Sequence, residues 1–380
     1  MHRIGIDARL YGQTGVGVYL RNLLYFLEKS PQNNLEFYIY FLPNEFRKLN
    51  FENKNFVKKL VSSPWHSFSE QTLLLNALYK DDLDLMHFTY FSYPVLYKRK
   101  FIATIHDTTP LLYKTGKAST KNPLLYEIKF QAFKFVMSQQ VKNAGLIITP
   151  SKTVKKQLIS IYGNKYEDKI KHIYEGVNFE LLESSKKILI SKSQFLNKFQ
   201  ISTNQIPISK NNQFFIYIGN FYPHKNVENL IKAFSKIKEK VNLILIGPDD
   251  YFANRLSRNI GITKRDQIIF YHSPSKEDLV FFYKNALALI HPSLSEGFGL
   301  PLVEAAYFKL PIIASNIAVF KEVLGNKYIS FRPEDPDDIA NKIKSFLKGR
   351  KKIGYTDILK KFSFEKMANN TLDLYNQELV

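Results

Sequence analysis

Apolar runs of strand length alternate with stretches of helical periodicity along the whole chain. In the first half we predict five strands, Arg3–Ala8, Glu36–Phe41, Leu83–Phe88, Phe101–His106 and Gly145–Thr149. One helical pattern between them follows Gly17 and carries leucines on a single face. Another begins after Ser151, a residue suited to capping a helix N-terminus. This alternation is typical of a parallel sheet built from strand–helix–strand units.

A second series of the same kind follows a segment of different composition. Ser, Lys, Asn and Gln dominate residues 184–212, which indicates a linker or a long surface excursion. After it we predict strands at Phe214–Gly219, Val241–Gly247, Ile268–Tyr271, Leu287–His291 and Pro311–Ser315. The last pattern, Phe364–Leu379, is a helix with no strand after it.

The chain is therefore predicted to be an α/β protein of two Rossmann-like, doubly wound parallel-sheet domains that face a cleft. The predicted boundaries are 1–180 for the first domain, 181–212 for the linker, 213–362 for the second domain and 363–380 for the C-terminal helix. Ligands of open parallel sheets bind at the carboxyl ends of the strands. We therefore expect the chemistry in the segments that follow predicted strands.

Composition narrows the classes of partner. The length of 380 residues suits two or three globular domains, and 54 Lys and Arg against 34 Asp and Glu give a formal net charge of +20, spread over both halves. This charge favours nucleotides, nucleic acid or an acidic membrane surface, although a lysine-rich solvated exterior explains it equally well.

The absence of cysteine excludes disulfides, thiolate metal sites and a cysteine nucleophile. No apolar run reaches the ~18–20 residues of a membrane-spanning helix, and Met1–Ile4 leads directly into a strand pattern, so we expect no signal peptide. A cytoplasmic protein is expected, which meets a membrane only from its inner surface.

The segment Pro292–Ala305 carries the strongest chemical signal. It follows a predicted strand and precedes a helix, in which Pro301 suits the first turn. Gly297 and Gly299 allow the backbone close to a ligand, and the free N–H groups of a helix start favour an anion such as phosphate. Glu296 lies in the loop and Glu304 about one turn into the helix, where a carboxylate is suited to a vicinal diol.

A second segment, Gly219–Asn226, also lies between a strand and a helix. Its Lys225 is suited to a phosphate group as a point charge. A lone lysine would carry little weight. Its position at a strand's carboxyl end, in the same half as the glutamate segment, favours a functional role.

In the first half, His106 ends a predicted strand and is followed by Asp107. Such a histidine donates to a sugar hydroxyl or a phosphate, or moves a proton, and a purely structural histidine is equally consistent with the pattern. Gly12, Gly15 and Gly17 form a flexible loop whose spacing is not the dinucleotide fingerprint, which argues against NAD. We interpret His87, at another strand end, as structural.

Other chemistries have little support in the sequence. The eight histidines show no close metal-binding pair, and the serine-hydrolase elbow is missing. Basic runs such as Lys98–Lys100 are short, and the aromatic residues fit core packing better than base stacking. We expect no metal, no cofactor and no nucleic-acid partner.

These residues resemble the retaining glycosyltransferases of family 4, which have the GT-B architecture, and the similarity covers nearly the whole chain. It begins at Ile4–Arg9 with Gly15–Leu24, continues through Ile105–Leu111 and the Pro223–Asn226 segment, and peaks at Ser295–Ala305, which looks like the family's Glu-x7-Glu signature. The pattern is most similar to the mannosyltransferase-like branch that builds surface polysaccharides.

The resemblance implies a role for each matching residue. Glu304 would hold the nucleotide ribose, and Glu296 would contact hydroxyls of the donor hexose. Lys225 would neutralise the diphosphate together with the N–H groups of three residues, Phe298, Gly299 and Leu300. His106 would touch the donor sugar near the scissile bond, and the Gly15–Gly17 loop would close over the phosphate.

It also implies no metal, a final helix that crosses back to the first domain, and acceptor binding by first-domain loops such as Tyr113–Asn122.

Three positions depart from the family pattern. Relatives usually place a second basic residue where Asn220 or His224 stands, so phosphate neutralisation is weaker here or depends on pH through His224. Lys309 occupies a position where relatives usually have glycine, at a cost of roughly 1 kcal/mol if its backbone is left-handed.

The interpretation is a hexosyl transfer, mannose-like favoured, from a GDP- or UDP-linked sugar to a glycan or lipid-linked oligosaccharide. Without a carboxylate nucleophile, retention suggests front-face displacement, in which the leaving diphosphate helps deprotonate the acceptor hydroxyl and the protein stabilises charge. The alternatives are a nucleotide-sugar epimerase or disaccharide synthase on the same fold, or a noncatalytic basic protein that binds polyanions.

Overall fold

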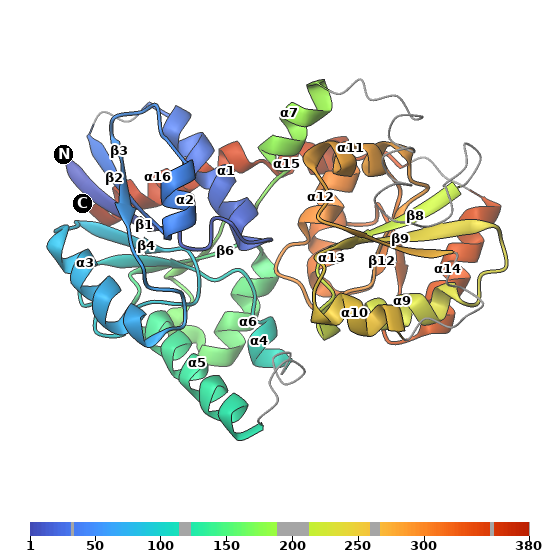
Figure 1. Cartoon of the computed structure of the whole chain (residues 1–380), viewed down its shortest axis with the longest axis horizontal. Coiled ribbons are helices and arrows are strands. Elements are labelled where there is room, and N and C mark those ends of the chain that lie inside the picture. The colour runs from blue at the N-terminus through green and yellow to red at the C-terminus, as the bar shows by residue number, and fades with distance from the viewer. Residues whose placement is uncertain (32–33, 114–122, 188–212, 259–266, 350–352, 380) are drawn as a thin grey trace. The chain divides into compact units, whose positions relative to one another are not determined.

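The computed structural model of the chain describes residues 1–31, 34–113, 123–187, 213–258, 267–349 and 353–379 (Figure 1). The chain forms two compact units. The first unit comprises Met1–Gly176 and Ser363–Val380, and the second comprises Val177–Phe362. Each unit is built around a parallel sheet, as the alternating pattern predicts.

The first unit contains a seven-stranded sheet in the order β3-β2-β1-β4-β5-β6-β7, and every pair of neighbouring strands is parallel. Its strands are β1 (His2–Asp7), β2 (Leu35–Phe41), β3 (Phe56–Leu60), β4 (Leu85–Phe88), β5 (Phe101–Thr104), β6 (Leu146–Thr149) and β7 (Ile170–His172). The strand order reverses direction at β1, which is the topological switch point where open parallel sheets bind ligands.

The helices of the first unit are α1 (Val16–Lys29), α2 (Pro43–Lys48), α3 (Leu75–Lys80), α4 (Thr109–Leu112), α5 (Pro123–Asn143), α6 (Lys152–Tyr162) and α16 (Phe364–Leu379). The predicted apolar face of α1 is confirmed, because Leu20, Leu23 and Leu27 are fully buried. The Ser151 side chain caps α6 by accepting a hydrogen bond from the Val154 N–H at 3.2 Å.

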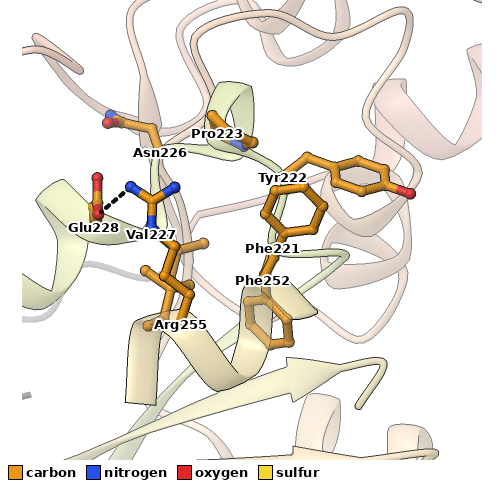
Figure 2. Close-up of a pocket in the computed structure, with 9 residues that line it drawn as sticks. Phe221, Tyr222, Pro223, Asn226, Val227, Glu228, Phe252 and Arg255 are labelled. Carbon is orange, nitrogen blue, oxygen red and sulfur yellow. Dashed lines mark ion pairs between the residues drawn. The ribbon is translucent and has the colours of Figure 1, made fainter. Parts of the chain in front are cut away.

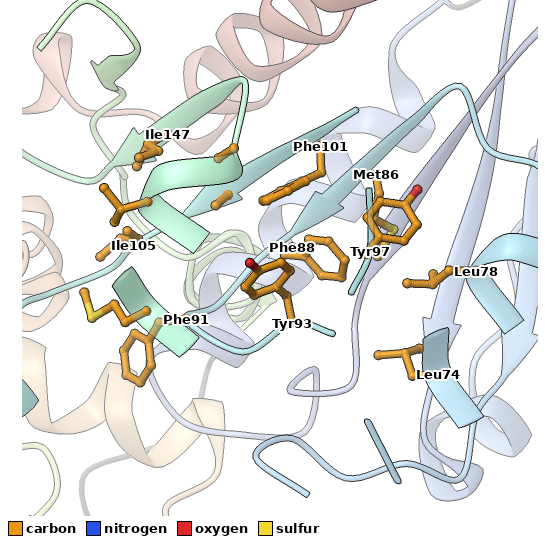
Figure 3. Packing of buried hydrophobic residues seen from close by; sticks show 14 of the residues in the cluster. Leu74, Leu78, Met86, Phe88, Phe91, Tyr93, Tyr97, Phe101, Ile105 and Ile147 are labelled. Carbon is orange, nitrogen blue, oxygen red and sulfur yellow. The ribbon is translucent and has the colours of Figure 1, made fainter. Parts of the chain in front are cut away.

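Aromatic residues pack among aliphatic ones in one core cluster of this unit (Figure 3). Phe88, at the end of β4, makes edge-to-face contacts with Tyr93, Tyr97 and Phe101 at centroid distances of 5.3 to 5.6 Å. Such pairs stabilise a core beyond the area that they bury.

The C-terminal helix α16 belongs to the first unit, as the GT-B prediction requires. It packs against α1, and its Tyr375 is fully buried with its hydroxyl 2.6 Å from Nδ1 of His87. Gly176 allows the chain to pass here, since a Cβ atom on it would lie 2.4 Å from the backbone nitrogen of Phe364.

The second unit contains a six-stranded parallel sheet in the order β10-β9-β8-β11-β12-β13. Its strands are β8 (Gln213–Ile218), β9 (Val241–Gly247), β10 (Ile268–His272), β11 (Leu289–His291), β12 (Ile312–Ser315) and β13 (Ile329–Phe331). The order reverses at β8, so the segments after β8 and β11 lie on either side of the switch point.

The helices of the second unit are α7 (Phe179–Lys187), α9 (Val227–Phe234), α10 (Tyr251–Arg258), α11 (Lys276–Asn285), α12 (Leu300–Tyr307), α13 (Ala318–Leu324), α14 (Pro336–Lys348) and α15 (Thr356–Lys361). Most of them join consecutive strands, which places their N-termini at the carboxyl edge of the sheet. This edge therefore combines strand ends with helix starts.

The predicted domain boundaries need correction. The second unit begins at Val177, and part of the segment expected to be a linker is the helix α7, which packs against α11. Lys276 Nζ lies 2.6 Å from Glu180 Oε2 and ties the two helices together. Residues 188–212 of the expected linker, and residues 114–122 of the expected acceptor loop, lie outside the described residues.

Three strands escaped prediction, namely β3, β7 and β13, and each is the edge strand of its sheet. Edge strands are short and carry charged residues, which protects them from pairing with other chains. Lys58 and Lys59 interrupt β3, and Lys171 interrupts β7. The apolar-run signal is therefore absent in β3 and β7, although both strands form.

Among the described residues, no helix combines the length and the apolar character that crossing a membrane requires.

Candidate active site

The glutamate segment of the second unit runs from the end of β11 into α12, as predicted. Gly299 is the N-cap of α12 with φ of 93°, a left-handed conformation that suits glycine, and Pro301 lies in the first turn. The N–H groups at this helix start point away from the helix body and form a site for negative charge. Phe298 is buried against Phe362, so it anchors the loop.

Glu296 is held by three donors that converge on one oxygen. Its Oε1 accepts from Lys225 Nζ at 2.7 Å, His291 Nε2 at 3.0 Å and Ser293 Oγ at 2.8 Å. The other oxygen, Oε2, receives none of the hydrogen bonds found among the described residues. The carboxylate is thus fixed through Oε1, and Oε2 remains for a ligand.

The charge state of Glu296 follows from these neighbours. Burial favours the neutral acid, but Lys225 and His291 act more strongly in the opposite direction and hold the pKa of Glu296 well below its usual range. In the Lys225–Glu296 pair the lysine side chain is 15% exposed and the glutamate side chain 10%. The site therefore keeps a charged carboxylate and a charged amine in contact, largely shielded from water.

The Lys225 loop and the Glu296 loop are fastened to each other. The carbonyl of His224 accepts from the Leu294 N–H at 2.8 Å. Asn226 adopts a left-handed conformation with φ of 59°, and its Nδ2 donates to the carbonyls of Pro292 at 3.0 Å and Pro333 at 2.7 Å. Asn226 is buried, so these bonds fix the Lys225 loop firmly beside the glutamate loop.

The start of the Lys225 loop is fixed by an aromatic residue of β8. The Tyr217 hydroxyl donates to the carbonyl of Asn220, and its ring stacks on His291 with centroids 5.8 Å apart. A Cβ atom on Gly219 would lie 2.9 Å from the Tyr217 hydroxyl. Gly219 and Asn220 therefore define the direction in which the loop leaves the sheet.

Glu304 lies one turn into α12 and is almost completely buried. Its Oε2 accepts from the Tyr283 hydroxyl at 2.6 Å, and the Tyr283 ring stacks on Phe308 with centroids 5.2 Å apart. Burial raises the pKa of Glu304 to about 7, while the Tyr283 hydrogen bond and the charge of Lys276 oppose that shift. The two glutamates of one loop and helix thus differ sharply in acidity.

His224 does not supply the second positive charge that the sequence left open. Burial, together with the charge of the neighbouring Lys225, lowers the pKa of His224 to about 4, although Glu296 acts in the opposite direction. The imidazole is therefore neutral near pH 7. Phosphate neutralisation that varies with pH through His224 is confined to acidic conditions.

A small cavity borders the Lys225 loop on the side of α10 (Figure 2). Tyr222 contacts Phe252 edge-to-face with centroids 4.9 Å apart, and Arg255 lies 3.6 Å from Glu228 at its rim. Lys225, Glu296 and Glu304 do not line this cavity. Its aromatic contacts hold the loop against α10.

In the first unit, His106 stands just beyond β5. Its Nε2 lies 2.9 Å from the carbonyl of Thr89, so this nitrogen carries hydrogen and donates. The Tyr19 ring packs edge-on against the imidazole at 4.7 Å, and Nδ1 lies 3.5 Å from Oε1 of Glu175. The histidine is nearly buried, with its orientation set from three sides.

The predicted glycine loop leads into α1, and Gly17 is already part of that helix. Gly15 is its N-cap with φ of 65°, and no atom lies near the place of a Cβ. A Cβ on Gly17 would lie 2.6 Å from the carbonyl of Tyr11, so this turn needs glycine. Gly15 is an open backbone position, whereas Gly17 is required by packing.

His87 is structural, as interpreted from the sequence. It is fully buried, with Nδ1 bonded to the Tyr375 hydroxyl and Nε2 2.7 Å from Oγ1 of Thr104. Burial lowers the pKa of His87 to about 3, so it stays neutral. It joins α16 to the sheet.

The structure brings the predicted residues of the second unit into one cluster: Gly219, Asn220, His224, Lys225, Glu296, Gly297, Phe298, Gly299, Leu300 and Glu304. Gly15, Gly17 and His106 belong to the first unit. Within the described part of the chain, no three His, Cys, Asp or Glu side chains gather as metal ligands would.

Comparison with known proteins agrees with this geometry. The family model of glycosyl transferases group 1 matches residues 198–357, and that of glycosyltransferase family 4 matches residues 14–181. The chain therefore carries the two glycosyltransferase domains that these models describe. The two matches correspond to the two units. The Lys225 and Glu296 loops lie within the match to glycosyl transferases group 1.

Among the proteins similar to this chain is the O-antigen chain mannosyltransferase RfbU of Salmonella typhimurium, 31% identical over 65% of each chain. The match thus spans less than two thirds of that relative. Two solved structures share the GT-B fold at low identity. One is sucrose-phosphate synthase of Thermosynechococcus elongatus, with a TM-score of 0.77, 17% sequence identity and 99% of both chains covered. The other is HepE of Anabaena in complex with UDP and glucose, with a TM-score of 0.72 and 14% sequence identity, and the match covers 99% of this chain and 100% of that one.

Sequence reasoning missed four residues that contact the predicted side chains in the two units. His291 and Ser293 hold Glu296, Tyr283 holds Glu304, and Glu175 faces His106. His291 ends a predicted strand at the correct edge and could have been found by its position alone. Tyr283 and Glu175 carry no local signal, because the fold brings them in from other elements.

Proposed function

We propose that the chain is a glycosyltransferase that moves a hexose from a nucleoside-diphosphate sugar to a glycan acceptor. The observation that carries the proposal is the Lys225–Glu296 contact of 2.7 Å at the N-terminal end of α12, with Glu304 one turn further along the same helix. One loop and one helix start thus combine a cation, backbone N–H groups and two carboxylates, which are the groups that a diphosphate, a ribose and a sugar require.

In this proposal the diphosphate lies at the N-terminus of α12. Lys225 and the N–H groups of Phe298, Gly299 and Leu300 stabilise its charge. Glu304 accepts hydrogen bonds from the ribose diol, and Oε2 of Glu296 accepts from a hexose hydroxyl. A related fold binds UDP and glucose in the HepE structure, which supports a nucleotide-sugar donor here.

We propose a mannose-like hexose and a glycan or lipid-linked acceptor of surface-polysaccharide synthesis. The likeness to an O-antigen chain mannosyltransferase supports this choice over other sugars. The competing reactions on the same fold are epimerisation of the nucleotide sugar and synthesis of a free disaccharide. The product formed distinguishes these reactions from transfer to a glycan.

We propose that the transfer retains the anomeric configuration and needs no metal. Lys225 and the α12 N-terminus neutralise the leaving diphosphate, and a phosphate oxygen takes the proton of the attacking hydroxyl on the same face of the sugar. Oε1 of Glu296 is occupied by three donors, so this carboxylate is better suited to holding hydroxyls than to attacking carbon.

We also propose that α5 attaches the protein to the inner face of an anionic membrane. Leu124, Ile128 and Phe135 of α5 are exposed, and at ~100° per residue they fall within about 40° of each other on the helix. Exposed Lys129 and Lys134 flank this stripe. Apolar residues beside lysines are typical of helices that lie in a lipid interface.

The experiment that tests the transfer uses labelled GDP-mannose and UDP-glucose with a lipid-linked glycan preparation. The expected result is label in the glycan, with the anomeric configuration of the transferred sugar the same as in the donor. EDTA should not reduce the transfer, and Glu304→Ala should abolish it. Inverted configuration would overturn retention. Label only in a free disaccharide or an epimerised donor would support the competing reactions, and no reaction with any donor would contradict transferase activity.

A further inference from the structure

Tyr283 extends from α11 to α12 and contacts that helix at two points one turn apart. Its hydroxyl donates to Oε2 of Glu304 at 2.6 Å, and its ring lies nearly parallel to that of Phe308, with an interplanar angle of 8°. Glu304 and Phe308 are four residues apart, so they lie on the same face at the end of α12. One side chain therefore fixes both this face and the carboxylate on it.

Tyr283 is closed off from ligands, whereas the carboxylate that it holds is not. Only 1% of Tyr283 is exposed. Oε1 of Glu304 receives no hydrogen bond from the described residues and is not among their enclosed atoms without a partner, so it reaches the surface of the unit. Tyr283 can therefore act on a ligand only through Glu304.

The helix that carries Tyr283 is firmly fixed at its N-terminus. The Ser275 hydroxyl accepts from the Asp278 N–H at 3.1 Å, and Oδ2 of Asp278 accepts from the Ser275 N–H at 3.0 Å. The Tyr271 hydroxyl of β10 donates to the same carboxylate at 2.9 Å. The Tyr283 hydroxyl is thus presented from a helix whose position is set by other contacts, as a positioning group requires.

Two groups of α11 act on the charge of Glu304. Burial favours the neutral acid and raises the pKa of Glu304 to about 7, whereas the Tyr283 hydrogen bond and the charge of Lys276 favour the ionised form. Removal of the Tyr283 hydroxyl would therefore let the carboxylate keep its proton to a higher pH.

The other elements that pack against α12 leave this balance unchanged. They are β11, β12 and α15. Strand β12 has no charged residue, and His291 of β11 bonds to Glu296 instead. The charged side chains of α15 are exposed: Asp357, Lys360 and Lys361. Among the described residues, Tyr283 and Lys276 are the groups whose loss would change the acidity of Glu304.

We infer that Tyr283 is a positioning residue for the nucleotide, which holds Oε2 of Glu304 so that an ionised carboxylate presents Oε1 to the ribose diol. The inference rests on the proposed function, in which Glu304 accepts hydrogen bonds from that diol. Donors that bond to a carboxylate stabilise its ionised form, and this form is the better acceptor for further hydroxyls. Tyr283 thus sets the lowest pH at which the nucleotide binds tightly.

The test is calorimetry on the full chain between pH 6 and pH 9. The probes are GDP and UDP, together with 2′,3′-dideoxy-GDP and 2′,3′-dideoxy-UDP, which lack the diol. The measured quantity is the ratio of the dissociation constant of the dideoxy nucleotide to that of its parent. Because both carry the same diphosphate, the titration of the phosphate cancels, and the ratio reports the contact between the diol and the carboxylate.

Three variants are compared with the wild type. Tyr283→Phe removes the hydroxyl and keeps the ring that stacks on Phe308. Tyr271→Phe is the matched control, because it removes another buried hydrogen bond between a tyrosine and a carboxylate that fixes α11, without contact to Glu304. Glu304→Gln has no charge at any pH.

In the wild type the ratio should fall as the pH drops below about 7, and in Tyr283→Phe this fall should begin about one pH unit higher. Tyr283→Phe should therefore bind the parent nucleotide roughly fivefold more weakly than the wild type at pH 7, and within about threefold at pH 9. Tyr271→Phe should follow the wild type, and Glu304→Gln should give a low ratio that does not vary with pH.

The same pH profile in Tyr283→Phe and in the wild type would overturn the inference and leave the proposed function intact. A ratio lowered by the same factor at every pH would assign Tyr283 to packing alone and would also overturn it. So would an equal displacement of the profile in Tyr271→Phe, because the stability of α11 would then be the cause.

Two results would reach further. A wild-type ratio near one at pH 9, with the parent nucleotide bound, would remove the ribose contact of Glu304 and this inference with it. A wild type that binds neither GDP nor UDP would overturn the proposed function itself.

Discussion

Lys225 Nζ lies 2.7 Å from Oε1 of Glu296, although 71 residues separate them in the chain. The contact joins the segment after β8 to the segment after β11, which are neighbours in the second sheet. Asn226 reinforces it by donating to the carbonyl of Pro292. The fold thus converts two separate sequence signals into one charged pair.

The acidity of Glu304 predicts how nucleotide binding depends on pH. Because burial raises its pKa to about 7, the carboxylate is ionised above pH 7 and increasingly protonated below it. The ribose diol donates hydrogen bonds, so it binds the ionised form more tightly. We expect the dissociation constant of the nucleoside diphosphate to rise by up to about tenfold between pH 7.5 and pH 6.

The matched variant is Glu304→Gln, which has no charge at either pH. Calorimetry should show that Glu304→Gln binds the nucleoside diphosphate more weakly than the wild type at both pH values. The affinity of this variant should vary with pH only through the titration of the ligand's own phosphate. A wild-type affinity that varies with pH no more than that of Glu304→Gln would contradict the role of Glu304.

Glu296 predicts a loss of stability in acid. Its folded-state pKa lies well below the ordinary value of 4.5, so its contribution to the free energy of unfolding is present above that value and is lost as the pH falls through the folded-state pKa. We expect Glu296→Gln to destabilise the second unit by roughly 1–3 kcal/mol at pH 7 and by much less at pH 2.

Urea unfolding at the two pH values measures this difference. Glu228→Gln is the control, because Glu228 is half exposed and 3.6 Å from Arg255, and it should change stability by less than about 0.5 kcal/mol. The same destabilisation by Glu296→Gln at pH 7 and pH 2 would show that its charge is not the cause.

The backbone conformation of Lys309 leads us to expect a stabilising substitution at this position. It ends α12 in a left-handed conformation with φ of 56°, and the Leu310 and Lys309 N–H groups donate to the carbonyls of Ala305 and Ala306 at 2.9 and 3.1 Å. This helix termination favours glycine. We expect Lys309→Gly to raise the free energy of unfolding by up to about 1 kcal/mol.

The same change inside a helix should have the opposite sign. Lys321 is exposed in α13, and Lys321→Gly should lower stability by about 1 kcal/mol. Both effects are visible by urea unfolding. A loss of stability in Lys309→Gly would mean that its side chain contributes more than the backbone conformation costs.

The apolar stripe of α5 predicts a membrane-binding variant. Replacing Ile128 and Phe135 by Asp should reduce co-flotation with anionic vesicles at low salt by at least about tenfold, because two exposed apolar groups and two neighbouring lysines are affected. High salt should weaken the wild type as well.

Tyr251→Asp is the control, since Tyr251 is exposed in the second unit. Flotation of the wild type that is absent at low salt, or unchanged by the double substitution, would contradict attachment through α5. The opposite face of the helix, which holds buried Met137 and Val141, is not altered by these changes.

The sequence predicts the strands that have uninterrupted apolar runs. It fails for edge strands, in which charged residues interrupt the apolar run. Strand β9 is predicted to the residue, whereas β3, with Lys58 and Lys59, is missed because an edge strand has one exposed margin. The helix α7 lies in a segment whose Ser and Lys content indicates a linker. Its stability comes from α11, through contacts that no local pattern encodes.

The candidate site shows the same division. Glu296, Glu304 and Lys225 are found from their places after strands and at a helix start. His291 and Ser293 are identified only when the structure places their donors on Glu296 Oε1. The sequence also leaves open whether His224 carries a charge, and its burial, which keeps the ring neutral near pH 7, depends on packing that leaves no trace in the sequence.

The most direct test of the central claim is thermal unfolding with GDP, UDP, dTDP and ADP on three proteins. These are the wild type, Lys225→Ala, and Lys232→Ala as a control at an exposed lysine of α9. A ligand at ~100 times its dissociation constant stabilises by about 2.7 kcal/mol, which is readily measured. The account predicts that one nucleotide raises the unfolding temperature of the wild type and Lys232→Ala but not of Lys225→Ala. No shift with any nucleotide, or an equal shift in Lys225→Ala, would contradict a nucleotide-sugar site at Lys225.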